Sequence, residues 1–108
     1  MIKISIYQDE GGRIDGFRCL GHAGYAESGH DIVCAAVSVL TMTAINSVET
    51  LTGDTFSYDE DEKKGMVDFR IVSPMSDQAA LLMGSLLVGL RMVEEVYGRR
   101  FIRIDTKK

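Results

Sequence analysis

The 108-residue sequence contains no tryptophan, a single proline and only two cysteines, Cys19 and Cys34. Two cysteines are too few for the disulfide framework of a small secreted protein. The first residues alternate between apolar and polar, without the charged-then-apolar pattern of a secretion leader. We therefore expect a cytoplasmic protein whose thiols are reduced. The length predicts a single domain over residues 1–108.

Long apolar runs are also lacking, as are basic residues in the middle of the chain. Polar residues interrupt the longest apolar candidate, which follows Ile32, so we expect no segment that spans a membrane. Between Cys19 and Glu62 there are eight acidic residues and no Lys or Arg. Because acidic surfaces repel phosphate backbones, we expect no direct nucleic-acid partner. A basic protein or peptide suits this charge better.

Hydrophobic patterns predict seven secondary-structure elements. Ile2, Ile4 and Ile6 alternate with polar residues, which indicates a strand, and a second strand from Ile14 to Leu20 follows a glycine turn. The remaining elements are a helix from Ile32 to about Thr52 with Asp31 as N-cap and Gly53 as its stop, a strand from Phe56 to Tyr58, a solvated acidic turn over 59–65, a strand from Met66 to Val72, a helix from Ser76-Asp77 to Tyr97 closed by Gly98, and a strand from Phe101 to Ile104.

The element order β-β-α-β-β-α-β contains no strand–helix alternation that would require a parallel sheet. It predicts an α+β fold, a two-layer sandwich with two helices packed on a largely antiparallel sheet. The first helix is apolar on two stripes, so we expect it to be covered on more than one side.

The first turn of that helix holds the residue with the clearest chemical potential, Cys34. The partial positive charge of a helix N-terminus favours thiolate over thiol. His22 lies twelve positions earlier, and the segment between them is long enough to bring the two together. Such a pair supports nucleophilic attack on a carbonyl, with the histidine as base and the first helical amides as oxyanion donors. This is the chemistry of a cysteine protease.

Other interpretations of these residues stay open. Cysteines are often buried and inert, which is the only role the residues suggest for Cys19. His30 competes with His22 as the base because it lies nearer to the cysteine. A metal site built from these histidines, Asp31 and Cys34 lacks the usual ligand spacings, so we expect no metal and no cofactor. Tyr25 is either a substrate contact or a surface aromatic residue.

Two sequence blocks carry a resemblance. From Gly21 the sequence reads Gly-His-Ala-Gly-Tyr-Ala, and from Asp31, after Gly29, it reads Asp-Ile-Val-Cys-Ala-Ala-Val-Ser. Together with the length and the element order, they resemble the ribosomal-processing cysteine protease family, Prp, over essentially the whole chain. The resemblance implies that Cys34 is the nucleophile and His22 the general base, with supporting roles for Asp31 and Ser38.

The glycine-rich segment between the blocks is predicted to close over a bound peptide. Its candidate substrate-binding residues are Gly21, Gly24, Tyr25 and Gly29. The family is a small homodimeric protease that removes a short N-terminal extension, hydrophobic and aromatic, from a large-subunit ribosomal protein, the twenty-seventh in the usual count. The resemblance therefore implies a ribosomal protein as substrate and a homodimer.

Two alternatives from other classes remain. A non-enzymatic ribosome-assembly factor could bind a basic ribosomal protein through the acidic region, and it would tolerate Cys34→Ala. A thiol redox sensor would need Cys19 as its resolving cysteine, so Cys19→Ser would abolish its response.

Overall fold

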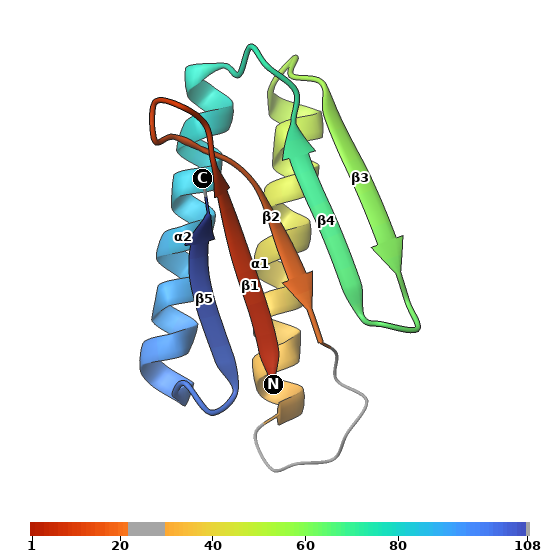
Figure 1. The fold of residues 1–108 in the computed structure, drawn as a ribbon, viewed down its shortest axis with the longest axis vertical. Helices are drawn as coiled ribbons and strands as arrows, with labels where there is room; N and C mark the ends of the chain where they lie inside the picture. Colours follow the sequence, from red (N-terminus) through yellow and green to blue (C-terminus); the bar gives the residue numbers. More distant parts are fainter. Residues whose placement is uncertain (22–29, 108) are drawn as a thin grey trace.

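The computed structural model describes residues 1–21 and 30–107, with His30 and Asp31 as backbone only. In this part of the chain five strands form one sheet, and two adjacent helices lie on one face of it (Figure 1). The elements are β1 (Ile2–Gln8), β2 (Ile14–Leu20), α1 (His30–Leu51), β3 (Phe56–Asp61), β4 (Met66–Ile71), α2 (Asp77–Tyr97) and β5 (Ile102–Lys107). This is the predicted order, and the predicted α+β fold is confirmed.

The strands follow the order β3-β4-β2-β1-β5 across the sheet. The pairs β1–β2, β2–β4 and β3–β4 are antiparallel, as expected. β5 runs parallel to β1, with Ile2 opposite Ile102 and Ile6 opposite Thr106. A parallel neighbour requires a crossover connection, which α2 supplies. The sheet is therefore mixed, although most of its pairs are antiparallel.

The core lies between the helices and the inner face of the sheet. Ile2, Ile4 and Ile6 are each at most 1% exposed, which confirms the alternation predicted for the first strand. On neighbouring strands the rings of Phe17 and Phe69 pack with centroids 5.7 Å apart. The helices add Val33, Val37, Ala44, Ile45 and Val48 from α1, and Ala79, Met83, Leu86, Leu90 and Val93 from α2. Burying one large apolar side chain stabilises by about 1.5–3 kcal/mol, so this cluster holds the two layers together.

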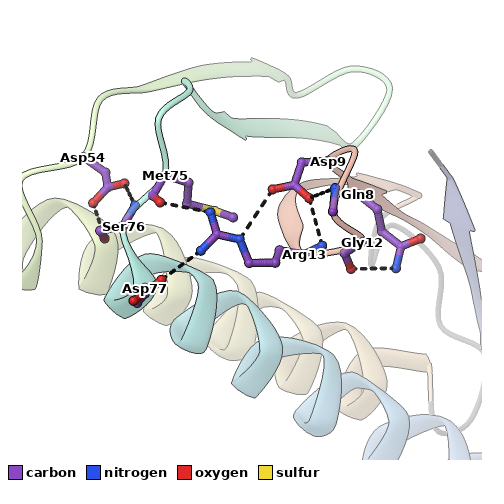
Figure 2. Close-up of polar contacts among 9 residues, drawn as sticks. Gln8, Asp9, Gly12, Arg13, Asp54, Met75, Ser76 and Asp77 are labelled. Carbon is purple, nitrogen blue, oxygen red and sulfur yellow. Dashed lines mark hydrogen bonds and ion pairs between the residues drawn. The ribbon is translucent and has the colours of Figure 1, made fainter.

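Both predicted ends of α2 are confirmed. The Ser76 hydroxyl accepts a hydrogen bond from the Ala79 N–H at 3.0 Å, as an N-cap does. Asp54, in the loop before β3, accepts from the Ser76 hydroxyl at 2.5 Å and from its N–H at 2.8 Å (Figure 2). Gly98 closes the helix at φ 98°, and its N–H donates to the Glu94 carbonyl at 2.9 Å.

The start of α1 corrects one prediction. The helix begins at His30, so Asp31 lies within its first turn and is not the N-cap. Cys34 is accordingly the fifth helical residue and lies just beyond the first turn. Helix boundaries read from a capping residue are commonly displaced by one or two positions.

The end of α1 also differs from the prediction. The helix ends at Leu51, and Gly53 does not adopt the left-handed conformation of a glycine stop. Instead the Thr52 hydroxyl donates to the Val48 carbonyl at 2.7 Å and accepts from the Asp54 N–H at 3.2 Å. A side chain therefore satisfies the helix end.

The acidic segment 59–65 was predicted as a solvated turn, and this is wrong for its first three residues. β3 continues to Asp61, in register with Met66 of β4, and only residues 62–65 form the turn. Pairing with β4 supplies backbone hydrogen bonds that outweigh the low strand propensity of acidic residues.

One finding concerns membranes. Residues 32–51 of α1, with a mean hydropathy of 1.6, are long and apolar enough to cross a membrane by length and composition alone. The expectation that no segment reaches this threshold is therefore wrong. Core helices pass the same test, and one face of α1 packs in the core through Val33, Val37 and Val48.

Candidate active site

A pocket of about 350 Å³ lies at the end of the sheet where β1 begins and β2 ends. Its walls are the first half of α1, the end of β2 with the start of β1, and the β3–β4 hairpin. It is lined by Ile2, Cys19, Gly21, Cys34, Val37, Ser38, Thr41, Met42, Glu60, Asp61, Glu62, Gly65, Met66 and Val67. Of the predicted site residues, the pocket brings together Cys34, Ser38 and Gly21.

Cys34 comes from the face of α1 that packs toward the sheet and is 7% exposed. Ser38 and Thr41 follow at intervals of four and three residues, so all three lie along one side of the helix. The Thr41 hydroxyl donates to the Val37 carbonyl at 2.8 Å, which satisfies this buried polar group. Ser38, for which the family resemblance implies a supporting role, therefore lies one helical turn beyond Cys34 on the pocket side of α1.

The second cysteine is a pocket residue that sequence reasoning missed. Cys19 is half-buried on β2, where it pairs with Ile4 and Val67 on the inner face of the sheet. Burial, and to a lesser degree the charge of Cys34, raises the pKa of the Cys19 thiol to about 11. Cys19 is therefore a neutral thiol at physiological pH. Its alternation with buried Phe17 was the available signal that it faces inward.

Three consecutive carboxylates form the outer wall. Glu60 and Asp61 end β3 and Glu62 starts the turn, and all three line the pocket. Asp61 Oδ1 accepts the backbone N–H groups of Lys63 and Lys64 at 3.0 and 3.2 Å. Within residues 1–21 and 30–107, the ion pairs engage other carboxylates. The wall therefore presents negative charge to the pocket.

Several predicted site residues cannot be compared with the structure. His22, Gly24, Tyr25 and Gly29 lie outside the described residues, as does the side chain of Asp31. Their predicted roles stay predictions. Gly21, the last described residue before this segment, lines the pocket, and its N–H donates to the Gly65 carbonyl at 3.1 Å.

The pocket offers a thiol beside a space large enough for a peptide side chain. The N-terminus of α1 lies one turn before Cys34 and favours the thiolate, whereas the acidic wall opposes it. Across the described ranges, no group of three or more His, Cys, Asp or Glu side chains is placed to hold a metal ion. The chemistry open to these residues is covalent attack by sulfur.

Comparison with known proteins agrees with this chemistry. The family model described as cysteine protease Prp matches residues 1–102. A ribosomal processing cysteine protease Prp from Staphylococcus aureus is 33% identical over 107 residues, which cover 99% of this chain and 100% of the relative.

Two solved structures are similar over the same extent. The essential ribosomal processing protease Prp from S. aureus in complex with a substrate peptide has a TM-score of 0.91 and 32% identity. The same protease with a covalently linked product peptide has a TM-score of 0.87 and 33% identity. Each alignment covers 99% of this chain and 100% of the solved chain.

Proposed function

The chain belongs to the Prp family and is a cysteine protease, and from this premise we propose that it removes a short N-terminal extension from the twenty-seventh protein of the large ribosomal subunit. The single observation that carries the proposal is the position of Cys34 in the wall of the pocket. The names of the relatives, which specify ribosomal processing, support the substrate class.

In the proposed mechanism Cys34 is the nucleophile and His22 the general base. The imidazole accepts the thiol proton, and the sulfur forms a bond to the scissile carbonyl carbon. The tetrahedral intermediate expels the amine, which takes the proton from the imidazolium and leaves a thioester on Cys34. Water, deprotonated by the same imidazole, then hydrolyses the thioester. The covalently linked product peptide of the S. aureus protease supports this order of events.

The pocket has two chemically different walls that suit a substrate of mixed character. Ile2, Val37, Met42, Met66 and Val67 form its apolar part. They suit the hydrophobic and aromatic extension that the family resemblance implies. The carboxylates of Glu60, Asp61 and Glu62 suit the positive charge of a ribosomal protein.

The location and assembly are part of the same proposal. We place the protease in the cytoplasm, where ribosomal proteins are made. We propose a homodimer that buries the apolar groove between α1 and α2, where Val39, Met92 and Val96 are each at least 60% exposed. The partner subunit would then cover a second side of α1, as expected from the two apolar stripes of this helix. A monomer mass by light scattering at working concentration would contradict the dimer.

The test is to incubate the wild type, Cys34→Ala and His22→Ala with the extended ribosomal protein and to identify products by mass spectrometry. We expect one cleavage near the N-terminus of the substrate, lost in both variants. Arg13→Ala serves as a control because Arg13 precedes β2, contacts Asp77 at the start of α2 and does not line the pocket.

Cleavage by Cys34→Ala at the wild-type rate would refute the assignment of the nucleophile. Stable binding of the ribosomal protein by wild type and Cys34→Ala alike, without any cleavage, would favour the assembly-factor interpretation.

A further inference from the structure

Basic side chains gather at the β5 edge of the sheet. Lys3 and Arg103 are partners in the parallel pairing of β1 with β5, and both are exposed. Each alternates along its strand with buried isoleucines, so both side chains lie on the face of the sheet that the helices leave uncovered (Figure 1). Neighbouring strands lie about 4.8 Å apart, so two positive charges stand side by side.

A third basic residue, Arg100, lies in the turn between α2 and β5. Its guanidinium carbon is 4.9 Å from the centroid of the Phe101 ring. The Phe101 carbonyl accepts the Ile2 N–H at 2.9 Å, which joins this turn to the start of β1. Stacking on an aromatic ring orders a guanidinium while the N–H groups at its edge can still bind a ligand. We call Lys3, Arg100 and Arg103 the basic patch.

The acidic residues of the protein compensate this patch only in part. Among residues 1–21 and 30–107, the ion pairs involve other basic residues, including Arg99, which lies 3.9 Å from Glu94. From Gly98 to Lys107 the sequence contains one acidic residue, Asp105. The acidic strand β3 is at the opposite edge of the sheet, roughly 19 Å from β5 at the usual strand spacing. Charges so far apart are screened, because the Debye length is about 8 Å at physiological ionic strength.

The chemistry of the patch fits phosphate groups. An arginine guanidinium presents a planar fork of N–H donors that binds two phosphate oxygens at once, and a lysine adds a point charge. The same groups bind carboxylates, so an acidic protein is the competing partner. RNA is favoured because it accompanies ribosomal proteins, the class of substrate that the names of the relatives specify.

The basic patch lies at the end of the sheet where the pocket opens. Lys3 follows Ile2, which lines the pocket, whereas Arg100 and Arg103 do not line it. RNA on the patch would therefore lie beside a protein substrate without filling the pocket.

We propose that the basic patch binds the phosphate backbone of RNA, so that the protease meets its protein substrate next to RNA. The choice of RNA rests on the proposed function, whereas the patch itself does not. The expectation of no nucleic-acid partner is drawn from the acidic residues between Cys19 and Glu62, and the patch lies outside that segment.

The test measures binding of a short fluorescein-labelled single-stranded RNA by fluorescence anisotropy, between about 50 and 200 mM salt. Binding without sequence preference should have a Kd of about 10⁻⁴ to 10⁻⁶ M at physiological salt. The patch variant carries Arg100→Gln and Arg103→Gln. The matched control carries Lys63→Gln and Lys64→Gln, which change the net charge equally at exposed positions of the β3–β4 turn.

The salt dependence gives the sharpest readout. Each phosphate contact to a single strand contributes about 0.7 to the slope of log K against log salt. The patch variant should therefore lose about 1.4 from this slope and bind at least about tenfold more weakly at 50 mM salt. The single variant Arg103→Gln should lose about 0.7, and the control should keep the wild-type slope. Equal slopes in the two double variants would overturn the proposal.

A competition experiment separates RNA from an acidic protein. Unlabelled RNA should displace the labelled RNA at a lower concentration of anionic groups than polyglutamate does. Displacement by polyglutamate at the same concentration of anionic groups would overturn RNA as the ligand.

Cleavage measurements separate the patch from the proposed function. The patch variant should keep kcat and KM for the ribosomal protein without RNA, because neither arginine lines the pocket. Cys34→Ala should bind RNA as tightly as the wild type. Cleavage by Cys34→Ala would refute the proposed function, while an RNA slope that falls only in the patch variant would leave the basic patch standing.

Discussion

The two ends of the sheet are held in different ways. At one end the β1–β2 turn meets the start of α2, and side chains join them. Arg13 pairs with Asp77 at 3.0 Å, donates to the Met75 carbonyl at 3.1 Å and lies 3.6 Å from Asp9 (Figure 2). At the other end the pocket opens, and Gly21 joins its neighbours through backbone atoms alone.

The Arg13 end of the sheet contributes mainly to stability, and the pocket end contributes mainly to binding and catalysis. Side chains at the Arg13 end form hydrogen bonds whose loss changes mainly the free energy of unfolding. At the pocket end, three neighbouring carboxylates and two thiols line a space of about 350 Å³, an arrangement that suits binding and catalysis better than stability. Substitutions at the two ends should therefore alter different measurements.

The largest expected effect concerns the two thiols of the pocket. At pH 8 a thiol of pKa about 11 has about 100-fold less thiolate than one with the ordinary pKa of 9.0. Cys19 should therefore react with iodoacetamide at least about 100-fold more slowly in the folded protein than in urea. Peptide mapping by mass spectrometry measures this, with Cys34→Ala as the control for label at Cys34. Equal labelling of Cys19 in both states would show that it is not buried.

The next effect belongs to the opposite end. Ser76→Ala removes the N-cap of α2 and one hydrogen bond to Asp54, so we expect a loss of about 1 kcal/mol in the free energy of unfolding. Denaturant unfolding measures the loss, and Ser57→Ala, at an exposed strand position, is the matched control. Cleavage kinetics below the melting temperature should be unchanged. A fall in kcat would mean that the two ends are coupled.

A smaller effect tests the charge of the pocket wall. Glu60 lines the pocket, while Asp59, its neighbour in β3, pairs with Asp68 away from it. Glu60→Gln should lower kcat/KM for a basic peptide about threefold at low ionic strength, whereas Asp59→Asn should not. The difference should shrink in 1 M salt because of screening. A threefold loss in both variants would indicate a general effect of net charge.

The smallest effect is a pH dependence at the Arg13 end. Hydrogen bonds from the hydroxyl and the N–H of Ser76 hold the pKa of Asp54 below 3.8. A carboxyl group with a lowered pKa stabilises the fold above its unfolded value and loses that contribution as pH falls through its folded value. The urea midpoint should therefore fall more steeply below pH 3.8 in the wild type than in Asp54→Asn. Parallel curves would contradict this role.

Local patterns in the sequence were sufficient for much of the fold. The alternation of Ile2, Ile4 and Ile6 and the caps Ser76 and Gly98 depend on nearby residues, so the sequence predicts them correctly. The parallel pairing of β5 with β1 depends on contacts between distant segments, and no local pattern carries it. The start of α1 was misplaced because Asp31 has the residue type of a cap without occupying the position.

The candidate site also has one part that local sequence predicts and another part that depends on contacts between distant segments. The position of Cys34 near a helix start and the family resemblance, which adds Ser38, predicted two of the residues that α1 contributes to the pocket. Cys19 and Glu60 join it through strand pairing, which determines the face that each side chain takes. Without the register of β2 and β3, an isolated strand cysteine and an acidic run gave no indication of a shared pocket.

The pairing of β5 with β1 also concerns how the protein is made. Ile2 lines the pocket, and its N–H donates to the Phe101 carbonyl at 2.9 Å. β5 is synthesised about 100 residues after β1. During most of the synthesis, β1 therefore lacks the strand that pairs with its outer edge. The pocket wall to which Ile2 belongs is therefore among the last parts of the fold to gain its full set of strand contacts during synthesis.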